Sequence, residues 1–298
     1  MPGRGGRFAG WGGWGAACGA GIVPPRPTRR GRGGLWETAA PPVSAAPPEP
    51  RALAVVDGRY RPAPTSPRMN TTYAPPVAAL GDDARAAFLV RTYTHLLGAI
   101  LAFAGIEVFL FTSGLAEPMA AAMLGTNWLL VLGAFMVVGW LASSTATRAT
   151  SRPAQYAALA AYVVAYAVLF VPLLYMANAY TGGGVIGSAA WVTLLGFSAL
   201  TALVFFTGKD FSFMGEMLKW LGIVAVLLIV ASVLFGFALG TWFSVAMIGF
   251  AGAAILYDSS NVLHNYPEDR YVAAALALFG SVALMFWYVL RLFMANRN

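Results

Sequence analysis

Seven long apolar runs constrain the fold of this 298-residue chain more than any other feature. A helix needs about 20 predominantly apolar residues to cross the hydrocarbon core of a bilayer. Only 10% of the residues are charged, against roughly 25% in soluble domains. The sequence therefore predicts an all-α, multi-pass membrane protein whose seven-transmembrane-helix domain covers residues 85–298. The spans are expected near 88–111, 127–144, 155–177, 188–207, 218–238, 241–262 and 271–294.

One apolar stretch must contain two of these spans. The stretch from Trp220 to Tyr257 is too long for a single crossing. Gly236 and Gly240 interrupt it, and glycine is the residue that most often follows the end of a helix. We therefore expect the fifth and sixth spans to form a tight helical hairpin.

Basic residues in the loops predict the orientation in the membrane. Arg85, Arg148, Arg152, Lys209 and Arg270 flank the spans on one side, and the alternate loops carry no Lys or Arg. The positive-inside rule then puts the N-terminus in the cytoplasm and, after seven crossings, the C-terminus outside. The short loops fit a bacterial protein, so the expected location is the cytoplasmic (inner) membrane.

Residues 1–84 are rich in Gly, Pro, Ala and Arg and lack periodicity, which predicts a disordered tail. Residues 1–68 carry ten arginines and three acids, whereas residues 69–298 carry nine basic and nine acidic residues. The net charge of +7 therefore belongs to the tail. Met69 is an alternative start, in which case residues 1–68 are absent from the native protein.

The arginines of the tail alternate with glycines, as in Gly3-Arg4-Gly5, which is also seen in RNA-binding segments. Such runs carry little specificity, and a solvated basic tail near anionic lipid heads explains them equally well. The solvated tail is preferred to RNA binding, and a true start at Met69, which would remove these runs, is preferred to both. The expected partner is therefore the lipid bilayer and no nucleic acid.

Asp258 is the most informative polar residue, because the flanking sequence places it inside the sixth span. A charged side chain at a span centre costs on the order of 2.5–3.5 kcal/mol or more, so such residues are usually functional or paired. Asn261 follows Asp258 by one turn, and Arg91 and His95 lie one turn apart in the first span. We expect these four residues to form a cluster in the cytoplasmic third of the membrane.

Alternatives stay open for each member of that cluster. Arg91 can extend to anionic lipid heads, as long basic side chains do near helix ends. His95 can be a hydrogen-bonded interior histidine rather than a proton switch. Asp258 can be the structural partner of another buried group.

The sequence contains no strong metal site and no complete catalytic site. Calcium takes six to eight oxygen ligands, so Asp258, Asn261 and nearby carbonyls predict at most transient calcium coordination. Cys18 is the only cysteine, and no other cofactor is expected. An intramembrane aspartyl protease needs two carboxyl groups that share a proton, and the seventh span carries no acid. The chain is therefore not expected to be an enzyme.

Three stretches carry motifs more specific than hydropathy. They are Phe88-Leu89-Val90-Arg91-Thr92-Tyr93, then Phe205-Phe206-Thr207-Gly208-Lys209-Asp210-Phe211-Ser212-Phe213-Met214-Gly215, and Tyr257-Asp258 followed by His264. The middle stretch is the most specific, since a Lys-Asp-Phe-Ser run has no generic reason to follow a membrane span. Through these motifs the chain from about 85 to 294 resembles the Bax inhibitor-1 (YccA-like, transmembrane Bax-inhibitor-motif) family.

The resemblance implies a bundle of six helices around a central seventh. It also implies a pH-sensitive calcium leak in some members, attributed to an acid pair that joins the sixth and seventh spans. The first acid of that pair corresponds to Asp258, and the position of the second falls on Ser281, which cannot titrate.

Two hypotheses about function follow. In the first, the protein is a stress-related, pH-sensitive calcium leak channel, an ion-transport function with Asp258 as the titrating gate. In the second, it is a non-transporting regulator of protein quality control that acts through a membrane protease or other protein partners.

Overall fold

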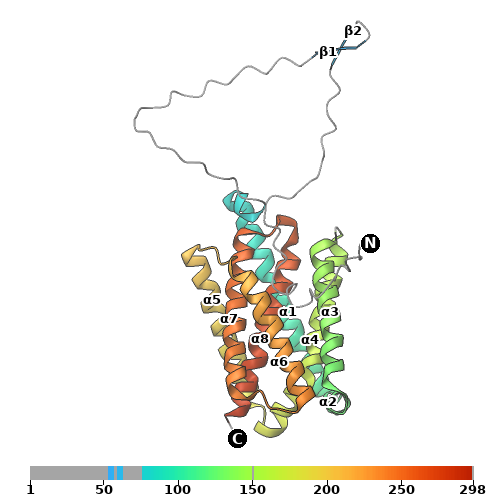
Figure 1. Cartoon of the computed structure of the whole chain (residues 1–298), viewed down its shortest axis with the longest axis vertical. Coiled ribbons are helices and arrows are strands. Elements are labelled where there is room, and N and C mark those ends of the chain that lie inside the picture. Colours follow the sequence, from blue (N-terminus) through green and yellow to red (C-terminus); the bar gives the residue numbers. More distant parts are fainter. Residues whose placement is uncertain (1–52, 57–58, 63–75, 150, 297–298) are drawn as a thin grey trace, which may run out of the picture. The chain divides into compact units, whose positions relative to one another are not determined.

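A computed structural model of the chain describes residues 53–56, 59–62, 76–149 and 151–296, and most of these residues are helical (Figure 1). The elements of the helical part are η1 (Val77–Ala79), α1 (Asp82–Thr112), α2 (Ala116–Leu124), α3 (Trp128–Arg148), α4 (Arg152–Thr181), α5 (Gly184–Thr207), α6 (Met214–Phe235), α7 (Gly240–His264), η2 (Glu268–Arg270) and α8 (Tyr271–Ala295).

Seven of these helices are long and apolar enough to cross a membrane, namely α1 and α3 to α8. Each coincides with one of the seven predicted spans, so the predicted fold class is confirmed. The helical hairpin between α6 and α7 also lies where expected. Gly236 ends α6 with φ +71° and Gly240 begins α7 with φ +66°, a backbone region that glycine adopts without steric cost.

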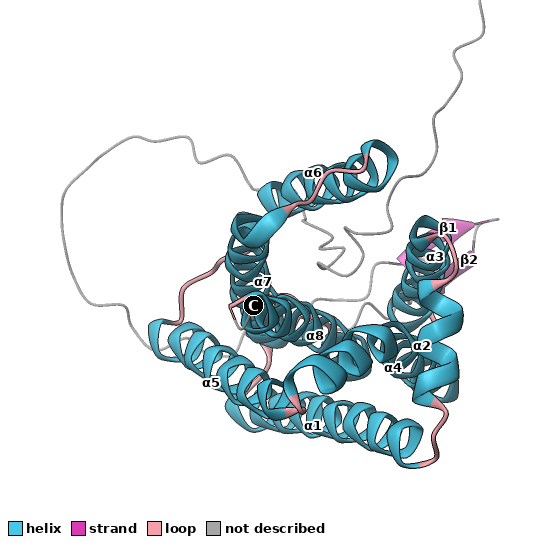
Figure 2. Cartoon of the chain, turned by 90° about the horizontal axis from the view of Figure 1, so that it is seen from below, coloured by secondary structure: helices cyan, strands magenta, loops and turns pink. Residues whose placement is uncertain are grey.

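The last helix, α8, is the centre of the bundle. It is buried nearly throughout from Tyr271 to Leu290, and α7, α5, α1, α4 and α3 all pack against it. Figure 2, which looks along the bundle, shows these helices gathered around α8. The first part of α8 is rich in alanine, and small residues allow the backbones of neighbouring helices to approach closely in a membrane.

Helix α6 departs from an even ring of six helices around one. It packs mainly against α7 and only lightly against α3. In Figure 2, α6 lies on the far side of α7 from α5 and α1. A cavity lies between α6 and α8.

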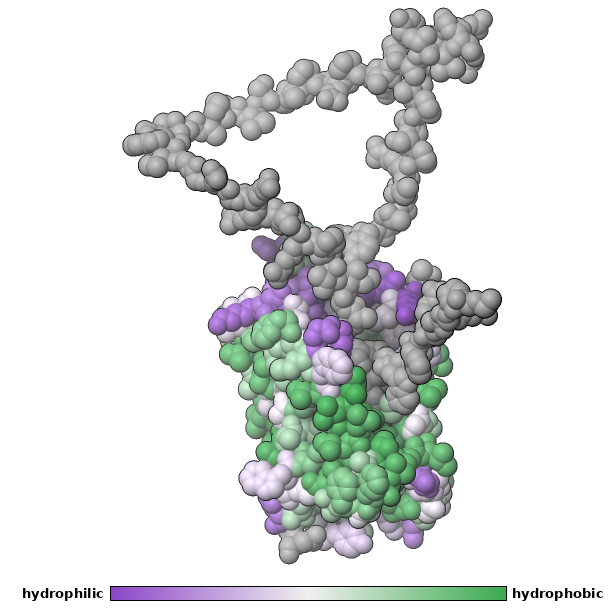
Figure 3. All heavy atoms as spheres, in the orientation of Figure 1, coloured by the Kyte–Doolittle hydropathy of each residue, from purple (hydrophilic) through white to green (hydrophobic). Residues whose placement is uncertain are grey.

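The outer surface of the bundle is apolar, as a lipid-facing surface must be. Figure 3 shows a broad hydrophobic band on one face, with hydrophilic residues at its upper end and fewer near its lower end. Large apolar side chains on the outside include Leu97, Leu101, Val137, Trp191, Leu195, Trp220, Leu227 and Trp242.

The short helix α2 was not expected from the sequence. It has nine residues, which is too short for a span. A search for apolar segments of about 20 residues therefore does not find it. Glu117 and Pro118 lie in its first turn, where an acid and a proline both favour a helix start.

The predicted boundary of the tail at residue 84 lies too far along the chain. Val77 is fully buried and its backbone N–H donates to the Tyr266 carbonyl at 2.9 Å, so the helical part begins before α1. Asp82 and Asp83 then open α1, where their charge is favourable at the positive end of the helix dipole. The composition of residues 1–84 suggested a tail throughout, and it hid two local features of the ordered part. These are the burial of Val77 and the two acids at the start of α1.

Two short strands also differ from the predicted disordered tail. β1 (Leu53–Val56) and β2 (Arg59–Pro62) pair antiparallel, with Leu53 opposite Pro62 and Val56 opposite Arg59. They belong to a separate compact unit of the chain. In the sequence an Asp-Gly pair separates them, a strong short-range hairpin signal that composition alone does not reveal. The remaining predictions for the tail, including the alternative start at Met69, lie outside the described residues.

Close packing of α8 against α4 gives a prediction about stability. A methyl group at Gly280 would lie 2.8 Å from the Tyr162 hydroxyl, and Tyr162 is buried and packed edge-on against Tyr166. Gly280→Ala should therefore lower the free energy of unfolding by about 1–3 kcal/mol, as other overpacked cores do. Unfolding of the purified protein in detergent measures the change.

The matched control is Gly105→Ala in α1, where no heavy atom lies within 4 Å of the added carbon. It should leave stability unchanged or raise it slightly, because alanine favours helix more than glycine does. Equal stabilities of the two variants would contradict the close approach of α4 and α8.

Candidate functional site

A five-residue segment of α7, Tyr257–Asn261, contacts several parts of the bundle, and we call it the α7 hub. All five residues are buried, with exposed fractions between 0% and 4%. Successive residues of an α-helix point about 100° apart, so five in a row face every side of α7. Each residue of the α7 hub accordingly meets a different neighbour.

Asp258 faces α8, where the Ser281 hydroxyl donates a hydrogen bond of 2.5 Å to its Oδ2. Asp258 is 1% exposed and Ser281 is 5% exposed. The two positions that the family resemblance pairs are thus in direct contact, with a serine in place of the second acid. Within the described residues, no basic side chain forms an ion pair with Asp258.

Ser259 faces α5 and α1. Its hydroxyl lies 3.3 Å from the hydroxyl of Thr201, within hydrogen-bond distance. The Tyr93 hydroxyl of α1 is buried beside this pair. The first span therefore reaches the α7 hub through a tyrosine, which the sequence analysis did not single out.

Ser260 holds the loop between α5 and α6. The Phe211 backbone N–H donates to the Ser260 hydroxyl at 2.8 Å, and this hydroxyl donates to Asp210 Oδ1 at 3.3 Å. The Ser212 backbone N–H donates to the same carboxylate oxygen at 2.8 Å. The Lys-Asp-Phe-Ser motif, which looked specific in the sequence, is therefore a loop docked on the α7 hub.

Asp210 lies outside the membrane-spanning helices, and its surroundings shift its titration. Partial burial raises the pKa of the Asp210 carboxyl, but the hydrogen bonds from Ser212 and Ser260 and the nearby His264 outweigh it. The net effect holds the pKa of Asp210 below its usual value, because donors and positive charge favour the charged form.

Tyr257 and Asn261 complete the α7 hub. Tyr257 packs so closely on the start of α6 that a methyl group at Gly215 would lie 2.8 Å from its ring. Asn261 Oδ1 accepts from the Asn265 side chain at 2.8 Å, and the Asn261 carbonyl accepts from the backbone N–H groups of Asn265 and Tyr266. Asn261 thus closes the end of α7, while its Nδ2 is buried without a hydrogen-bond partner among the described residues.

Arg91 and His95 do not join Asp258, so the predicted four-residue cluster is wrong in this respect. His95 Nδ1 bonds the Arg91 carbonyl at 2.6 Å, and its Nε2 lies 3.2 Å from the Tyr156 hydroxyl. Tyr156 in turn pairs with the Tyr271 hydroxyl at 2.9 Å. These residues surround the first residue of α8, whereas Asp258 bonds ten residues further along that helix.

The arginines near Tyr271 make contacts with its ring. The guanidinium carbon of Arg152 lies 4.9 Å from the ring centroid and that of Arg91 lies 6.0 Å from it. Such cation–π contacts hold a positive charge against an aromatic face. Helical periodicity correctly put Arg91 and His95 on one face, but that face turns toward α4 and the start of α8.

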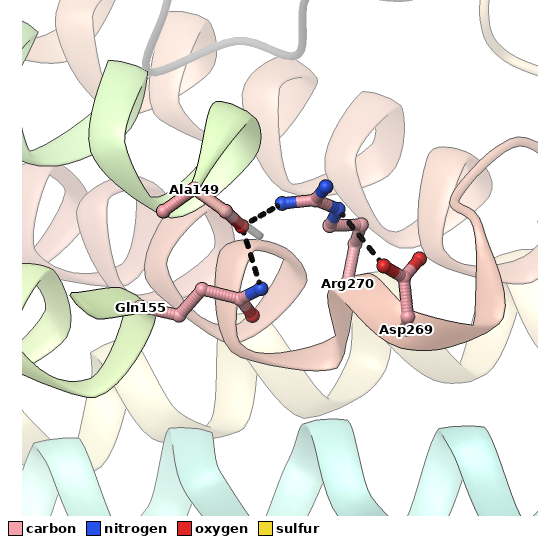
Figure 4. Close-up of polar contacts among 4 residues, drawn as sticks. All are labelled: Ala149, Gln155, Asp269 and Arg270. Atoms are coloured by element: carbon pink, nitrogen blue, oxygen red, sulfur yellow. Dashed lines mark hydrogen bonds and ion pairs between the residues drawn. The ribbon is translucent and has the colours of Figure 1, made fainter. Parts of the chain in front are cut away.

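The loop before α8 is also fixed to its neighbours. Arg270 donates to the Ala149 carbonyl at 2.6 Å, and Gln155 donates to the same oxygen at 3.1 Å. Figure 4 shows both donors converging on this carbonyl, with Asp269 on the other side of the Arg270 guanidinium at 3.3 Å. The connection from α7 to α8 is thereby tied to the end of α3 and the start of α4.

A metal centre is not evident in the part of the chain that the structure describes, where no three His, Cys, Asp or Glu residues come together. The transient calcium coordination expected at Asp258 stays a prediction. A second buried acid, Glu107 of α1, is 7% exposed, and neither of its oxygens has a hydrogen-bond partner among the described residues.

A family model and several curated proteins match this chain, and their descriptions agree with one another. The family model described as Inhibitor of apoptosis-promoting Bax1 matches residues 85–298. Protein LIFEGUARD 4 of Arabidopsis thaliana is 32% identical over 151 residues, which are 48% of this chain and 58% of that protein. The BI1-like protein of the same plant is 31% identical over 128 residues, 40% of this chain and 49% of that protein.

A bacterial relative is also similar. The Modulator of FtsH protease YccA of Escherichia coli (strain K12) is 38% identical over 106 residues, 35% of this chain and 48% of that protein. The chain thus spans about half the length of the curated relatives that it matches.

The docked loop predicts a pH-dependent stability. A carboxyl group whose folded pKa is lowered stabilises the fold above its unfolded pKa of about 3.9, and this contribution is lost as the pH falls through the folded pKa. Asp210→Asn should therefore lower the unfolding temperature at about pH 7, and the difference from the wild type should shrink at about pH 3. Thermal unfolding at both pH values measures it.

Glu268→Gln is the control, because Glu268 is exposed and no hydrogen bond to its side chain occurs among the described residues. Its effect should be small at both pH values. A deficit in Asp210→Asn that is the same at both pH values would contradict the role of the charged carboxylate.

Proposed function

The chain belongs to the Inhibitor of apoptosis-promoting Bax1 family, and on that premise we propose that this multi-pass membrane protein is a non-catalytic regulator of a membrane protease. The observation that carries the proposal is the 38% identity to a protein named as a modulator of FtsH protease. We also propose a bacterial cytoplasmic membrane as its location and the N-terminus as cytoplasmic, in line with the loop charges.

The geometry of the bundle supports a regulatory rather than a transporting role. The buried face of α8 consists mainly of Ala, Leu, Val and Phe, and Ser281 bonds Asp258 rather than lining a polar path. An ion path needs polar groups or carbonyls along its length. The polar groups of the α7 hub are instead directed at neighbouring helices and loops.

The same packing suggests how a protease would be regulated. Proteolysis acts on locally or globally opened states, so a protease that cuts a membrane helix needs that helix to separate from its neighbours first. In this bundle α8 packs against several helices, and the α7 hub links α7 to α1, α5, α6 and α8. A bundle that resists such opening would occupy the protease without being cut and so slow its turnover of other substrates.

The proposal predicts inhibition in a reconstituted system. Proteoliposomes that contain FtsH from Escherichia coli and a membrane substrate should degrade that substrate more slowly as the full chain is added, until the effect saturates. An unrelated seven-helix membrane protein at the same concentration is the control. Unchanged degradation, or rapid loss of the chain itself with no effect on the substrate, would contradict the proposal.

A second candidate function is a pH-sensitive calcium leak, with Asp258 as the gate. One observation favours it. Asp258 is a fully buried carboxyl in a span and its hydrogen-bond partner is a neutral hydroxyl, so a change in its protonation alters the charge at the α7–α8 contact. Buried acids inside membrane helices are functional candidates by default.

This second candidate predicts a pH-dependent flux. Calcium release from proteoliposomes should change between about pH 6 and about pH 8, a range in which most folded proteins remain stable. Asp258→Asn should remove the pH dependence, because the amide does not titrate. Glu107→Gln, which changes a different buried acid, should retain it. Flux equal to that of empty liposomes at both pH values would rule out the leak.

A further inference from the structure

A cavity of about 570 Å³ lies between α8 on one side and α3, α4 and α6 on the other. This volume is in the range of about 300–1,000 Å³ that is usual for small-molecule sites. Its lining is predominantly apolar and aromatic, and includes Leu132, Phe170, Ile229 and Leu284. It lies where α6 is held mainly by α7, so the loose packing of α6 is what leaves the space.

One end of the cavity has the groups of a membrane–water interface. Arg291 lines it near the end of α8, and no described carboxylate forms an ion pair with this arginine. Trp128 and Trp287 also line the cavity, and their rings stack with centroids 6.2 Å apart. Tryptophan is enriched at the level of the lipid head groups, and arginine binds phosphate through its planar set of donors.

The other end of the cavity reaches Ser281 in the middle of α8. Arg291 and Ser281 are ten residues apart, so about 15 Å of helix separates them. The hydrocarbon core of a bilayer is about 30 Å thick, and 15 Å is therefore the depth of one leaflet. The cavity thus combines a cation at head-group level with an apolar space one leaflet deep.

We propose that this cavity binds one anionic phospholipid from the adjacent leaflet. The phosphate binds the Arg291 guanidinium. It lies on the solvent side of the stacked Trp128 and Trp287 rings. One acyl chain follows α8 between α3 and α6 and ends beside Ser281. An apolar chain needs no hydrogen-bond partner, whereas an extended peptide segment in the same space would leave backbone N–H and C=O groups unsatisfied.

The position of the chain end gives the site a consequence. Ser281 lines the cavity and also donates to Asp258. The bound lipid therefore packs against the α7–α8 contact, and its presence or absence changes the environment of that hydrogen bond. Only Ser281 then separates the lipid from Asp258. The lipid site does not depend on whether the protein regulates a protease.

The test is native mass spectrometry of the full chain released from nanodiscs that contain equal amounts of phosphatidylglycerol and phosphatidylcholine. The wild type should keep one phospholipid and prefer phosphatidylglycerol. Arg291→Gln should weaken retention of phosphatidylglycerol by about tenfold, the effect of losing one charge-assisted contact. Arg148→Gln is the matched control, since it removes an exposed arginine that does not line the cavity.

A second pair of variants tests the apolar part. Ser232 lines the cavity from α6, so Ser232→Phe should take up part of the space for the acyl chain and weaken lipid retention. Val224→Phe adds the same side chain at an exposed position of α6 outside the cavity and should keep the lipid. Thermal unfolding shows whether both variants remain folded.

Several outcomes would overturn the proposal. They are a wild type without bound lipid, equal retention of the two lipids, and lipid retention in folded Ser232→Phe that matches Val224→Phe. A photoreactive residue at position 232 that forms adducts only with protein would show that a second copy or another segment covers the cavity, which also overturns it.

Discussion

The hydrogen bond between Asp258 and Ser281 is the interaction on which the arrangement of the bundle depends most directly. It joins α7 to the central α8 at a point where both side chains are buried. A buried carboxyl without a partner is costly, so this contact favours one rotation of α7 against α8 over others. That rotation in turn directs Ser259 to α5, Ser260 to the loop before α6, and Tyr257 to the start of α6. One polar contact thereby specifies the neighbours of a whole helical turn.

The dense packing around α8 and the cavity beside it have a common origin. The small residues in the first part of α8 let α4, α5 and α7 approach closely, and the Gly280 backbone lies against Tyr162. Further along, α8 carries the bulky Trp287, Tyr288 and Arg291, and α6 is held mainly by α7. The same helix is therefore tightly packed near its start and borders the cavity from Gly280 to Met294. Gly280 and Tyr162, which form the close contact, also line the cavity, so dense packing and open space meet in the middle of α8.

The fold could be predicted from the sequence because apolar length decides whether a segment crosses a membrane. All seven spans satisfied that criterion, whereas α2 did not, being too short. The partner of Asp258 was indicated by family resemblance, not by periodicity. Periodicity put Arg91 and His95 on one helical face correctly, but it cannot give the rotation of α1 about its axis. That rotation brings Tyr93 to the α7 hub and turns His95 toward Tyr156.

The identity of residue 281 bears on whether the α7–α8 contact is a switch. Two acids that share one proton repel each other once that proton is lost, so an acid pair opens or closes with pH. A serine hydroxyl donates to a charged carboxylate, and it can equally accept from a protonated one. The Asp258–Ser281 contact therefore survives in both protonation states, with only the direction of donation reversed. A contact that persists across pH acts as a permanent link between two helices. This chemistry favours the protease regulator over the pH-gated leak, and it leaves the cavity beside Ser281 as the feature through which a ligand can influence the pair.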